Sequence, residues 1–216
     1  MALPFTVVTP TEVEAGYLRG LGDVVVSGVG EGAATRAVAA LEGDVSAIVL
    51  AGFCGGLADG LAVADVVVPE RVIDEAGEAI VVDVGEGLST GHTLVTVNAV
   101  VTQPADKRTL GARTGADAAD MESVAFLRAC AGRGMAGAVV RAVSDGVDDA
   151  LPASIGDWVT PEGKSRVSAA LGWAGVRPGR LAELTRLKAR ADRAGASLRE
   201  AVIRLSETWP PDGSRV

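Results

Sequence analysis

The stretch Ala47-Ile48-Val49-Leu50-Ala51, followed directly by Gly52-Phe53-Cys54-Gly55-Gly56, decides the fold class. The run from Ala47 to Ala51 is continuously apolar and has the length of a strand, which predicts a strand that is buried on both faces. Such strands belong to sheets that are covered by helices on both sides. The glycines lie where this strand is expected to end, and open α/β sheets bind ligands beyond the carboxyl ends of their strands.

Strands and helices alternate on the N-terminal side of this stretch. Residues 5–9 and 24–27 are predicted strands, and helices are predicted from Thr11 to about Leu21 and over residues 33–41. This alternation is typical of parallel strands joined by crossover helices.

The pattern changes after the glycines. Residues 65–69, 70–74, 79–83 and 93–97 are predicted short strands joined by turns. Strands joined by short turns run antiparallel, so part of the sheet is expected to be antiparallel or mixed. Further elements complete the sheet: a helix over 104–114, a strand over 116–120, a helix over 123–133 and an apolar strand over 136–144, which Arg141 interrupts.

Beyond Leu151 the pattern is helical. Residues 158–173 carry one helical pattern, the sequence Val176-Arg177-Pro178-Gly179 breaks it, and apolar residues then recur at helical spacing as far as Leu205. We therefore predict one domain over residues 1–216, a three-layer α/β/α sandwich with a central mixed sheet. Residues 151–209 are its helical C-terminal extension, and the tail from residue 210 is expected to fray.

Composition and charge limit the possible partners. The 216 residues are 48% hydrophobic and only 3% aromatic, which suits a core of small and β-branched side chains. The formal net charge of -8 argues against a nucleic-acid partner and against an anionic membrane, because both bind basic surfaces. Arginine is dense only between Arg177 and Arg204, where interleaved acidic residues favour a solvated helix face.

The cysteines and the lengths of the apolar runs exclude further classes of protein. Cys54 and Cys130 lack metal-ligand spacing and His92 is the single histidine, so no metal site is predicted and a disulfide is not favoured. No apolar run approaches the ~20 residues of a membrane-spanning helix. No signal peptide is recognised, which favours a cytoplasmic protein.

The turn Gly28-Val29-Gly30 follows the second predicted strand. It resembles part of a dinucleotide-binding fingerprint, but Ala33 stands where the third glycine belongs, so a nicotinamide cofactor is not predicted. The alternative is a tight turn whose helix N-terminus can attract an anion. Cys54 and His92 could form a nucleophile and base, but they lack a third group to orient them.

Carboxylates follow two of the later strands. Asp120 and Glu122 are not expected to enter the same pocket, so Asp120 is expected to cap the next helix while Glu122 reaches inward. Asp145, beside Ser144, ends the last strand, where burial would let the carboxyl keep a proton as a general acid does. Taken singly, these positions are better explained as a helix cap and a turn residue.

Four motifs in this order resemble those of the nucleoside phosphorylase and methylthioadenosine/adenosylhomocysteine nucleosidase superfamily. They are Gly52-Phe53-Cys54-Gly55-Gly56-Leu57, Ala64-Asp65-Val66-Val67-Val68, Ala119-Asp120-Met121-Glu122-Ser123 and Val140-Arg141-Ala142-Val143-Ser144-Asp145. The resemblance covers residues 4–148 and implies a phosphorylase/hydrolase-like fold. Pro161-Glu162-Gly163-Lys164 and the break at Arg177-Pro178 are most similar to the hopanoid-associated phosphorylases, which are assigned to removing adenine from adenosylhopane.

The resemblance implies roles for the matching residues. Glu122 would accept hydrogen bonds from the ribose hydroxyls, and Met121 would pack on the sugar. Asp145, helped by Ser144, would donate a proton to N7 of the purine, so that the base leaves as a neutral molecule while the sugar becomes cationic.

Three further positions are expected to line the substrate. Val100 and Val101 match the positions that face the base, where their small side chains would stack less than an aromatic ring. Phe53 stands where the relatives usually carry Ser or Thr, which removes a polar contact from the site.

The attacking group stays open. In the nucleosidases a glutamate after the first strand activates water, and Glu14 matches it, with Glu12 as the alternative. In the phosphorylases a glycine-rich turn holds phosphate, and Gly28 and Gly30 match that turn, although Glu31 is unfavourable beside an anion. No cofactor is expected, and phosphate is a possible co-substrate.

These residues predict an enzyme that cleaves the N-glycosidic bond of an adenosyl nucleoside and releases adenine by phosphorolysis or hydrolysis. Adenosylhopane is the specific hypothesis, since an apolar group on the 5′ carbon would suit a leucine-rich C-terminal flap. The resemblance also implies a homo-oligomer. The alternative is a catalytically silent nucleoside- or lipid-binding protein on the same scaffold, which Phe53 and the imperfect phosphate turn motivate.

Overall fold

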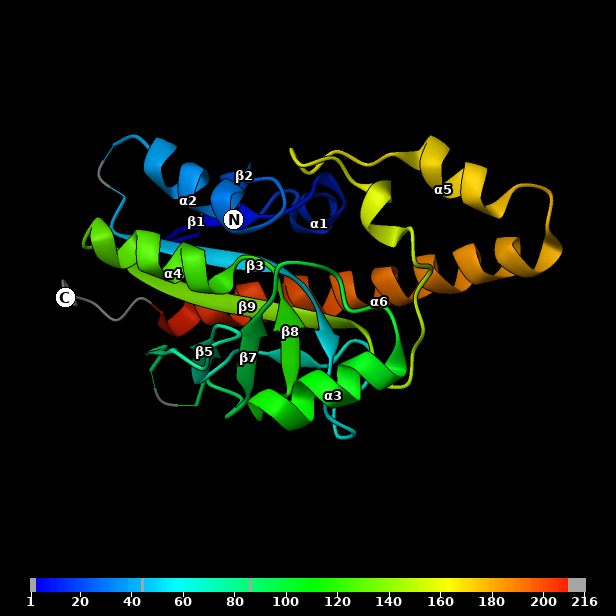
Figure 1. Cartoon of the computed structure of the whole chain (residues 1–216). Helices are drawn as coiled ribbons and strands as arrows, with labels where there is room; N and C mark the ends of the chain where they lie inside the picture. The colour runs from blue at the N-terminus through cyan, green and yellow to red at the C-terminus, as the bar shows by residue number, and fades with distance from the viewer. Residues whose placement is uncertain (1–2, 44, 86, 210–216) are drawn as a thin grey trace.

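The computed structural model of the chain describes residues 3–43, 45–85 and 87–209. Its centre is a 9-stranded sheet with the order β2-β1-β3-β8-β7-β5-β6, in which β9 pairs with β3 and β4 (Figure 1). The strands are β1 (Thr6–Thr9), β2 (Val24–Val26), β3 (Ala47–Gly56), β4 (Val66–Val67), β5 (Arg71–Ile73), β6 (Ala79–Val81), β7 (Thr93–Thr96), β8 (Ala118–Asp120) and β9 (Ala136–Asp145). The helices are α1 (Glu12–Leu18), α2 (Glu31–Ala40), α3 (Pro104–Thr114), α4 (Ser123–Gly132), the 3₁₀ helix η1 (Ile155–Trp158), α5 (Val167–Ala174) and α6 (Pro178–Thr208).

The sheet is mixed, as predicted. β3 runs parallel to β1 and β9, whereas β8 is antiparallel to β3, β4 to β9 and β6 to β5. The strand predicted to end at Ala51 continues through the glycines to Gly56, because their backbone keeps pairing with β9 on one side and β8 on the other. The glycines therefore form part of the sheet and do not follow it as a loop.

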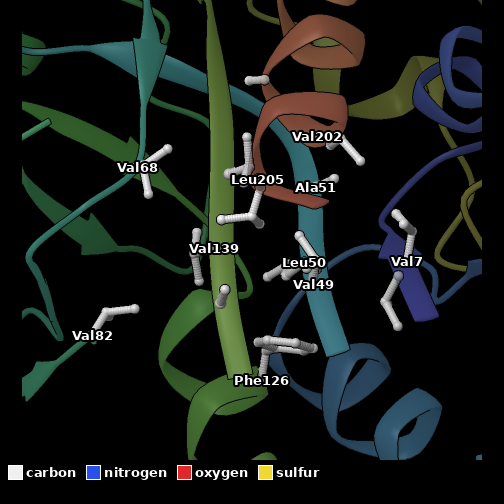
Figure 2. Packing of buried hydrophobic residues seen from close by; sticks show 14 of the residues in the cluster. Val7, Val49, Leu50, Ala51, Val68, Val82, Phe126, Val139, Val202 and Leu205 are labelled. Carbon is white, nitrogen blue, oxygen red and sulfur yellow. The ribbon is translucent and has the colours of Figure 1, made fainter. Parts of the chain in front are cut away.

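Helices cover the central strands from both sides. α4 and α6 both pack on β3 and β9, and α2 packs on α4 (Figure 1). Figure 2 shows Val202 and Leu205 of α6 and Phe126 of α4 beside Leu50 and Val139 of the two central strands. All five side chains are buried, so these strands lie in the middle of the core, as the apolar run in β3 predicts.

The C-terminal extension differs from its prediction. Residues 158–173 do not form one helix, since residues 159–166 separate η1 from α5. Pro161 and Gly163 lie in this segment, and their carbonyl oxygens accept hydrogen bonds from the backbone of Val29 and Glu12. These hydrogen bonds to the body of the protein hold the segment in a conformation that is not helical.

The long amphipathic helix is present as α6, and it begins at Pro178 inside the predicted break. Its buried residues start only at Ala194, so the first half of the helix projects beyond the core. Within the described ranges no helix is both long and apolar enough to cross a membrane. The predicted fraying beyond residue 209 lies outside the described residues.

Candidate active site

Glu14 is the carboxylate of α1 that faces the interior. Glu14 is buried and Glu12 is exposed, which decides between the two candidates. Oε2 of Glu14 accepts a hydrogen bond of 2.6 Å from the Thr11 hydroxyl, and Oε1 accepts one of 2.7 Å from the backbone N–H of Phe53. Burial raises the pKa of Glu14, while these hydrogen bonds and the charge of Arg141 oppose the rise.

Arg141 lies at the centre of the site, on β9, and is fully buried. Its Nη2 atom donates to carboxylate oxygens of Asp120 and Glu122, the latter at 3.3 Å. Its Nε and Nη1 atoms have no hydrogen-bond partner among the described residues. Burial disfavours the cation, but the surrounding carboxylates outweigh it and raise the pKa of Arg141. A buried cation with free N–H groups is suited to hold a polar or anionic ligand.

Gly52 leaves the space in which Arg141 and Glu14 approach each other. A methyl group on Gly52 would lie 2.5 Å from Nη1 of Arg141 and 2.7 Å from Oε1 of Glu14. Both atoms therefore border the same small volume above β3. Only a residue without a side chain leaves room for both atoms there, so the donor and the acceptor lie close together.

Asp120 and Glu122 do reach the same group, contrary to prediction. β8 ends at Asp120 and the chain bends at Met121 and Glu122, and both carboxylates contact Nη2 of Arg141. Asp120 also accepts a hydrogen bond of 3.1 Å from the backbone N–H of Ser123, the first residue of α4, although the N-cap position of that helix is occupied by Glu122. The Thr96 hydroxyl donates to Asp120 as well, at 2.8 Å, so the Asp120 carboxylate is fully engaged.

Glu122 joins the Arg141 cluster to the turn after β2. Its Oε1 atom accepts a hydrogen bond of 2.9 Å from the backbone N–H of Gly30. Burial is the main cause that raises the pKa of Glu122 to about 7, and the charge of Arg141 opposes the rise. Glu122 can therefore change its protonation state near neutral pH.

The turn Gly28-Val29-Gly30 is held by the protein itself. The N–H of Gly30 bonds to Glu122, and the N–H of Val29 donates to the carbonyl oxygen of Pro161 at 3.0 Å. A methyl group on Gly28 would lie 2.4 Å from the same carbonyl oxygen, and the φ of 89° also requires glycine. Two of the amide groups that a phosphate would need are therefore already bonded.

Asp145 lies at the end of β9, four residues beyond Arg141. The Ser144 hydroxyl donates to its Oδ1 at 2.6 Å, and Nζ of Lys107 donates to its Oδ2 at 2.5 Å. A register shift between Cys54 and Gly55 of β3 leaves Ser144 without a partner in the ladder, and such bulges reorient the side chains around them. Lys107 pairs with Asp145, so the carboxyl group does not lie in the apolar surroundings that the sequence suggested.

The residues predicted to line the substrate lie on β3, in the loop between β7 and α3, and in the bend between β8 and α4. Met121 and Val101 are partly buried and pack on a small apolar cluster behind β7 and β8, whereas Val100 is 42% exposed. The ring of Phe53 packs against Tyr17 with ring centroids 6.0 Å apart. Phe53 therefore contributes its backbone N–H to Glu14 and its side chain to packing.

Two residues of the site were not proposed from the sequence. Arg141 was noticed only as an interruption of an apolar strand, and that interruption is the signal. The sequence signal for Lys107 is weaker: this residue stands three positions before Leu110 and shares the buried side of α3 with it. The pairing of Cys54 with His92 has no support, because burial raises the pKa of the Cys54 thiol and His92 contacts the Thr90 hydroxyl.

The sequence matches one protein family. The model of the phosphorylase superfamily matches residues 8–92 and 78–171, which include every residue of the site. No curated protein matches the chain in sequence.

Solved structures share the fold at low sequence identity. The 5′-methylthioadenosine/S-adenosylhomocysteine nucleosidase of Helicobacter pylori is 13% identical with a TM-score of 0.67, over 94% of this chain and 97% of that one. The futalosine hydrolase of Helicobacter pylori is also 13% identical with a TM-score of 0.66, over 94% and 97% of the two chains. The S-adenosylhomocysteine nucleosidase of Streptococcus pyogenes, in complex with 5-methylthiotubericidin, is 17% identical with a TM-score of 0.68, over 97% and 98%.

Proposed function

Because the chain belongs to the phosphorylase superfamily, we propose that it cleaves the N-glycosidic bond of a purine nucleoside and releases the free base. The observation that carries the proposal is the position of two polar groups on one strand. In the pairing of β9 with β3, Arg141 is the partner of Gly52, and Asp145 is the partner of Gly55. Glu14 and Glu122 lie beside Arg141. Similar folds in nucleosidases and in a futalosine hydrolase support the same class of reaction.

Glu14 and Arg141 form the end of the site that would activate the attacking group. In the proposed reaction Oε1 of Glu14 and Nη1 of Arg141, which both approach Gly52 closely, bind the attacking water molecule. The water oxygen attacks C1′ of the ribose and gives a proton to Glu14, whose raised pKa suits a general base. Glu122, on the other side of Arg141, accepts hydrogen bonds from the ribose hydroxyls, which strengthen as the sugar becomes cationic.

Asp145 forms the end of the site that would receive the base. As the bond from C1′ to the purine breaks, its electron pair stays on the base and Asp145 delivers a proton to N7. Ser144 and Lys107 fix the two oxygens of the carboxylate at 2.6 and 2.5 Å.

We propose hydrolysis in preference to phosphorolysis. Glu14 is positioned to act as a base, while the Gly30 amide of the expected phosphate turn is bonded to Glu122 and the Val29 amide to Pro161. A carboxylate at that turn would also repel a phosphate dianion. Gly28 and Gly30 then support Glu122 and hold no co-substrate.

The group on the 5′ carbon is proposed to be apolar. The resemblance of the C-terminal extension to hopanoid-associated proteins makes adenosylhopane the specific candidate, with methylthioadenosine as a smaller one. The test is a comparison of kcat/KM for adenosine, methylthioadenosine and a long-chain adenosyl lipid. A lipid substrate turned over no better than adenosine would reject the lipid part of the proposal and leave the reaction class standing.

The reaction class is tested by adenine release from these nucleosides by the natural protein and by Asp145→Asn. We expect release by the natural protein and a loss of about 10²-fold or more in the variant. A protein that binds nucleosides tightly and releases no base over hours would be the catalytically silent binding protein, and the proposal would be wrong.

A further inference from the structure

Residues 164–188 form a projecting arm that consists of α5, the loop after it and the beginning of α6. In Figure 1 this arm extends to the right, away from the sheet. Ala174 is the one buried residue of α5, and α6 has none before Ala194. The arm therefore contributes almost nothing to the core, so its apolar side chains need another explanation.

The arm carries most of the large hydrophobic side chains that the described residues leave exposed. The exposed fraction is 61% for Val167, 56% for Leu171, 94% for Val176 and 44% for Leu181. Val167 and Leu171 are four residues apart and so share one side of α5, and Val176 lies in the loop at the tip. Such a gathering of exposed aliphatic side chains marks an interaction surface.

The arm is also basic, although the chain is acidic. Over residues 164–188 there is one acidic residue, Glu183, and there are six basic ones: Lys164, Arg166, Arg177, Arg180, Arg186 and Lys188. The local charge of +5 contrasts with -8 for the whole chain, which leaves -13 for the remaining residues. Asp157 and Glu162 precede the arm and lie on the segment tied to the body.

We propose that this arm binds the surface of an anionic lipid bilayer, with Val176, Leu171 and Leu181 entering the boundary of the acyl chains. Aliphatic side chains surrounded by arginine and lysine are typical of segments that lie in the membrane interface. This inference is independent of the proposed reaction, and it revises two expectations from the sequence, namely that the net charge argues against an anionic membrane and that the arginine-dense stretch is only a solvated helix face.

The length of the arm explains how an acidic protein can approach an anionic surface. Residues 178–189 of α6, which precede the ion pair of Arg190 with Asp149, span about 18 Å at ~1.5 Å per residue. Electrostatic repulsion is screened over ~8 Å at physiological ionic strength. The tip can therefore contact the bilayer while most of the acidic body stays more than a screening length away, although Asp148 and Asp149 lie beside Glu183 and Arg186.

A second copy of the chain fits the surface less well. A symmetric contact of tip against tip would bring the basic side chains of two arms close together. A bilayer that contains anionic lipid supplies the opposite charge and the apolar interior together.

The test is co-sedimentation of the full chain with vesicles of phosphatidylcholine alone or mixed with phosphatidylglycerol. We expect binding to the anionic vesicles to exceed binding to the neutral ones by about tenfold or more, and to fall as salt is raised. Leu171→Asp with Val176→Asp should lower the bound fraction about tenfold, and so should Arg166→Glu with Arg177→Glu. Matched controls are Val81→Asp, at a position that is 74% exposed on β6, and Arg36→Glu on α2, which should bind like the natural protein.

Two results would overturn the proposal. The first is a natural protein that does not bind anionic vesicles, or arm variants that bind them as well as the controls do. The second is light scattering that shows an oligomer which Leu171→Asp with Val176→Asp converts to monomers, since the apolar tip would then be covered by another copy. Unchanged melting temperatures would confirm that the variants are folded.

Discussion

Nζ of Lys107 lies 2.5 Å from Oδ2 of Asp145, and both side chains are almost completely buried. The same ammonium donates to the carbonyl oxygens of Gly146 at 2.8 Å and of Asp149 at 2.9 Å. The helix α3 thereby fixes the end of β9 and the carboxylate that we place at the leaving base. A buried ion pair of this kind is costly to break from one side, because the remaining charge has no partner.

Lys107→Met should therefore impair both stability and activity. Loss of the cation leaves the Asp145 carboxylate and two carbonyl oxygens without their donor, so we expect a loss of roughly 3–5 kcal/mol in the free energy of unfolding. Denaturant unfolding followed by circular dichroism measures this loss, and adenine release should fall by at least about tenfold.

The double variant Lys107→Met with Asp145→Asn separates charge from shape. If the cost of the single change comes from an unpaired carboxylate, then removing that charge should restore a large part of the stability while activity stays low. Stability losses that simply add in the double variant would show that the ion pair is not the cause.

Glu14→Gln should remove the proposed general base and leave the fold intact. The amide oxygen of Gln can still accept the hydrogen bond from the backbone of Phe53, so the melting temperature should change little. Adenine release should fall by about 10²- to 10⁴-fold at nearly unchanged nucleoside affinity. Glu12→Gln is the matched control, because Glu12 is exposed in the same turn of α1 and should keep full activity. Equal losses in both variants would contradict the assignment.

Gly52→Ala tests the space between Arg141 and Glu14. The new methyl group would lie 2.5 Å from Nη1 of Arg141, so the two side chains must move apart. We expect a loss of about 1–3 kcal/mol in the free energy of unfolding and a drop in kcat of at least about tenfold. Gly60→Ala has nothing within 4 Å of the added methyl group and should behave like the natural protein.

The pH dependence of activity should report Glu122. Its ionised form accepts the ribose hydroxyls, so kcat/KM should rise with pH and level off above the pKa of Glu122, about 7. The measurement is kcat/KM from pH 5.5 to 9 for the natural protein and for Glu122→Gln. A rising limb that persists unchanged in the variant would assign it to another group.

The same pKa has a consequence for stability. Burial raises the pKa of Glu122 from the ordinary value of 4.5 to about 7, so the folded protein binds its proton more tightly than the unfolded chain does. The contribution of Glu122 is fully present below the ordinary value and is lost as pH rises through about 7. Glu122→Gln should therefore gain melting temperature relative to the natural protein between pH 5 and pH 8, and a constant difference would contradict the shift.

The elements of the sheet could be predicted because their signals are local. The apolar run from Ala47 places β3 in the middle of the sheet, and Pro104 marks the start of α3. The partners of Arg141 could not be predicted in the same way. They come from α1, β8 and the start of α4, and only the folded chain brings these elements to one strand.

Lys107 and residues 159–166 were missed for related reasons. A lysine on a helix is usually solvated, and its burial here depends on carbonyl oxygens and a carboxylate that lie 38 to 42 residues later. The helical pattern over residues 158–173 was overridden by hydrogen bonds to Glu12 and Val29, which lie at the other end of the chain.

The central claim is hydrolysis of a purine N-glycosidic bond, and product analysis tests it most directly. Methylthioadenosine and adenosine would be incubated with the protein with and without inorganic phosphate, and the sugar products identified by NMR. We predict adenine together with the free sugar at the same rate in both conditions. Adenine formed only with phosphate, together with a sugar 1-phosphate, would contradict the account.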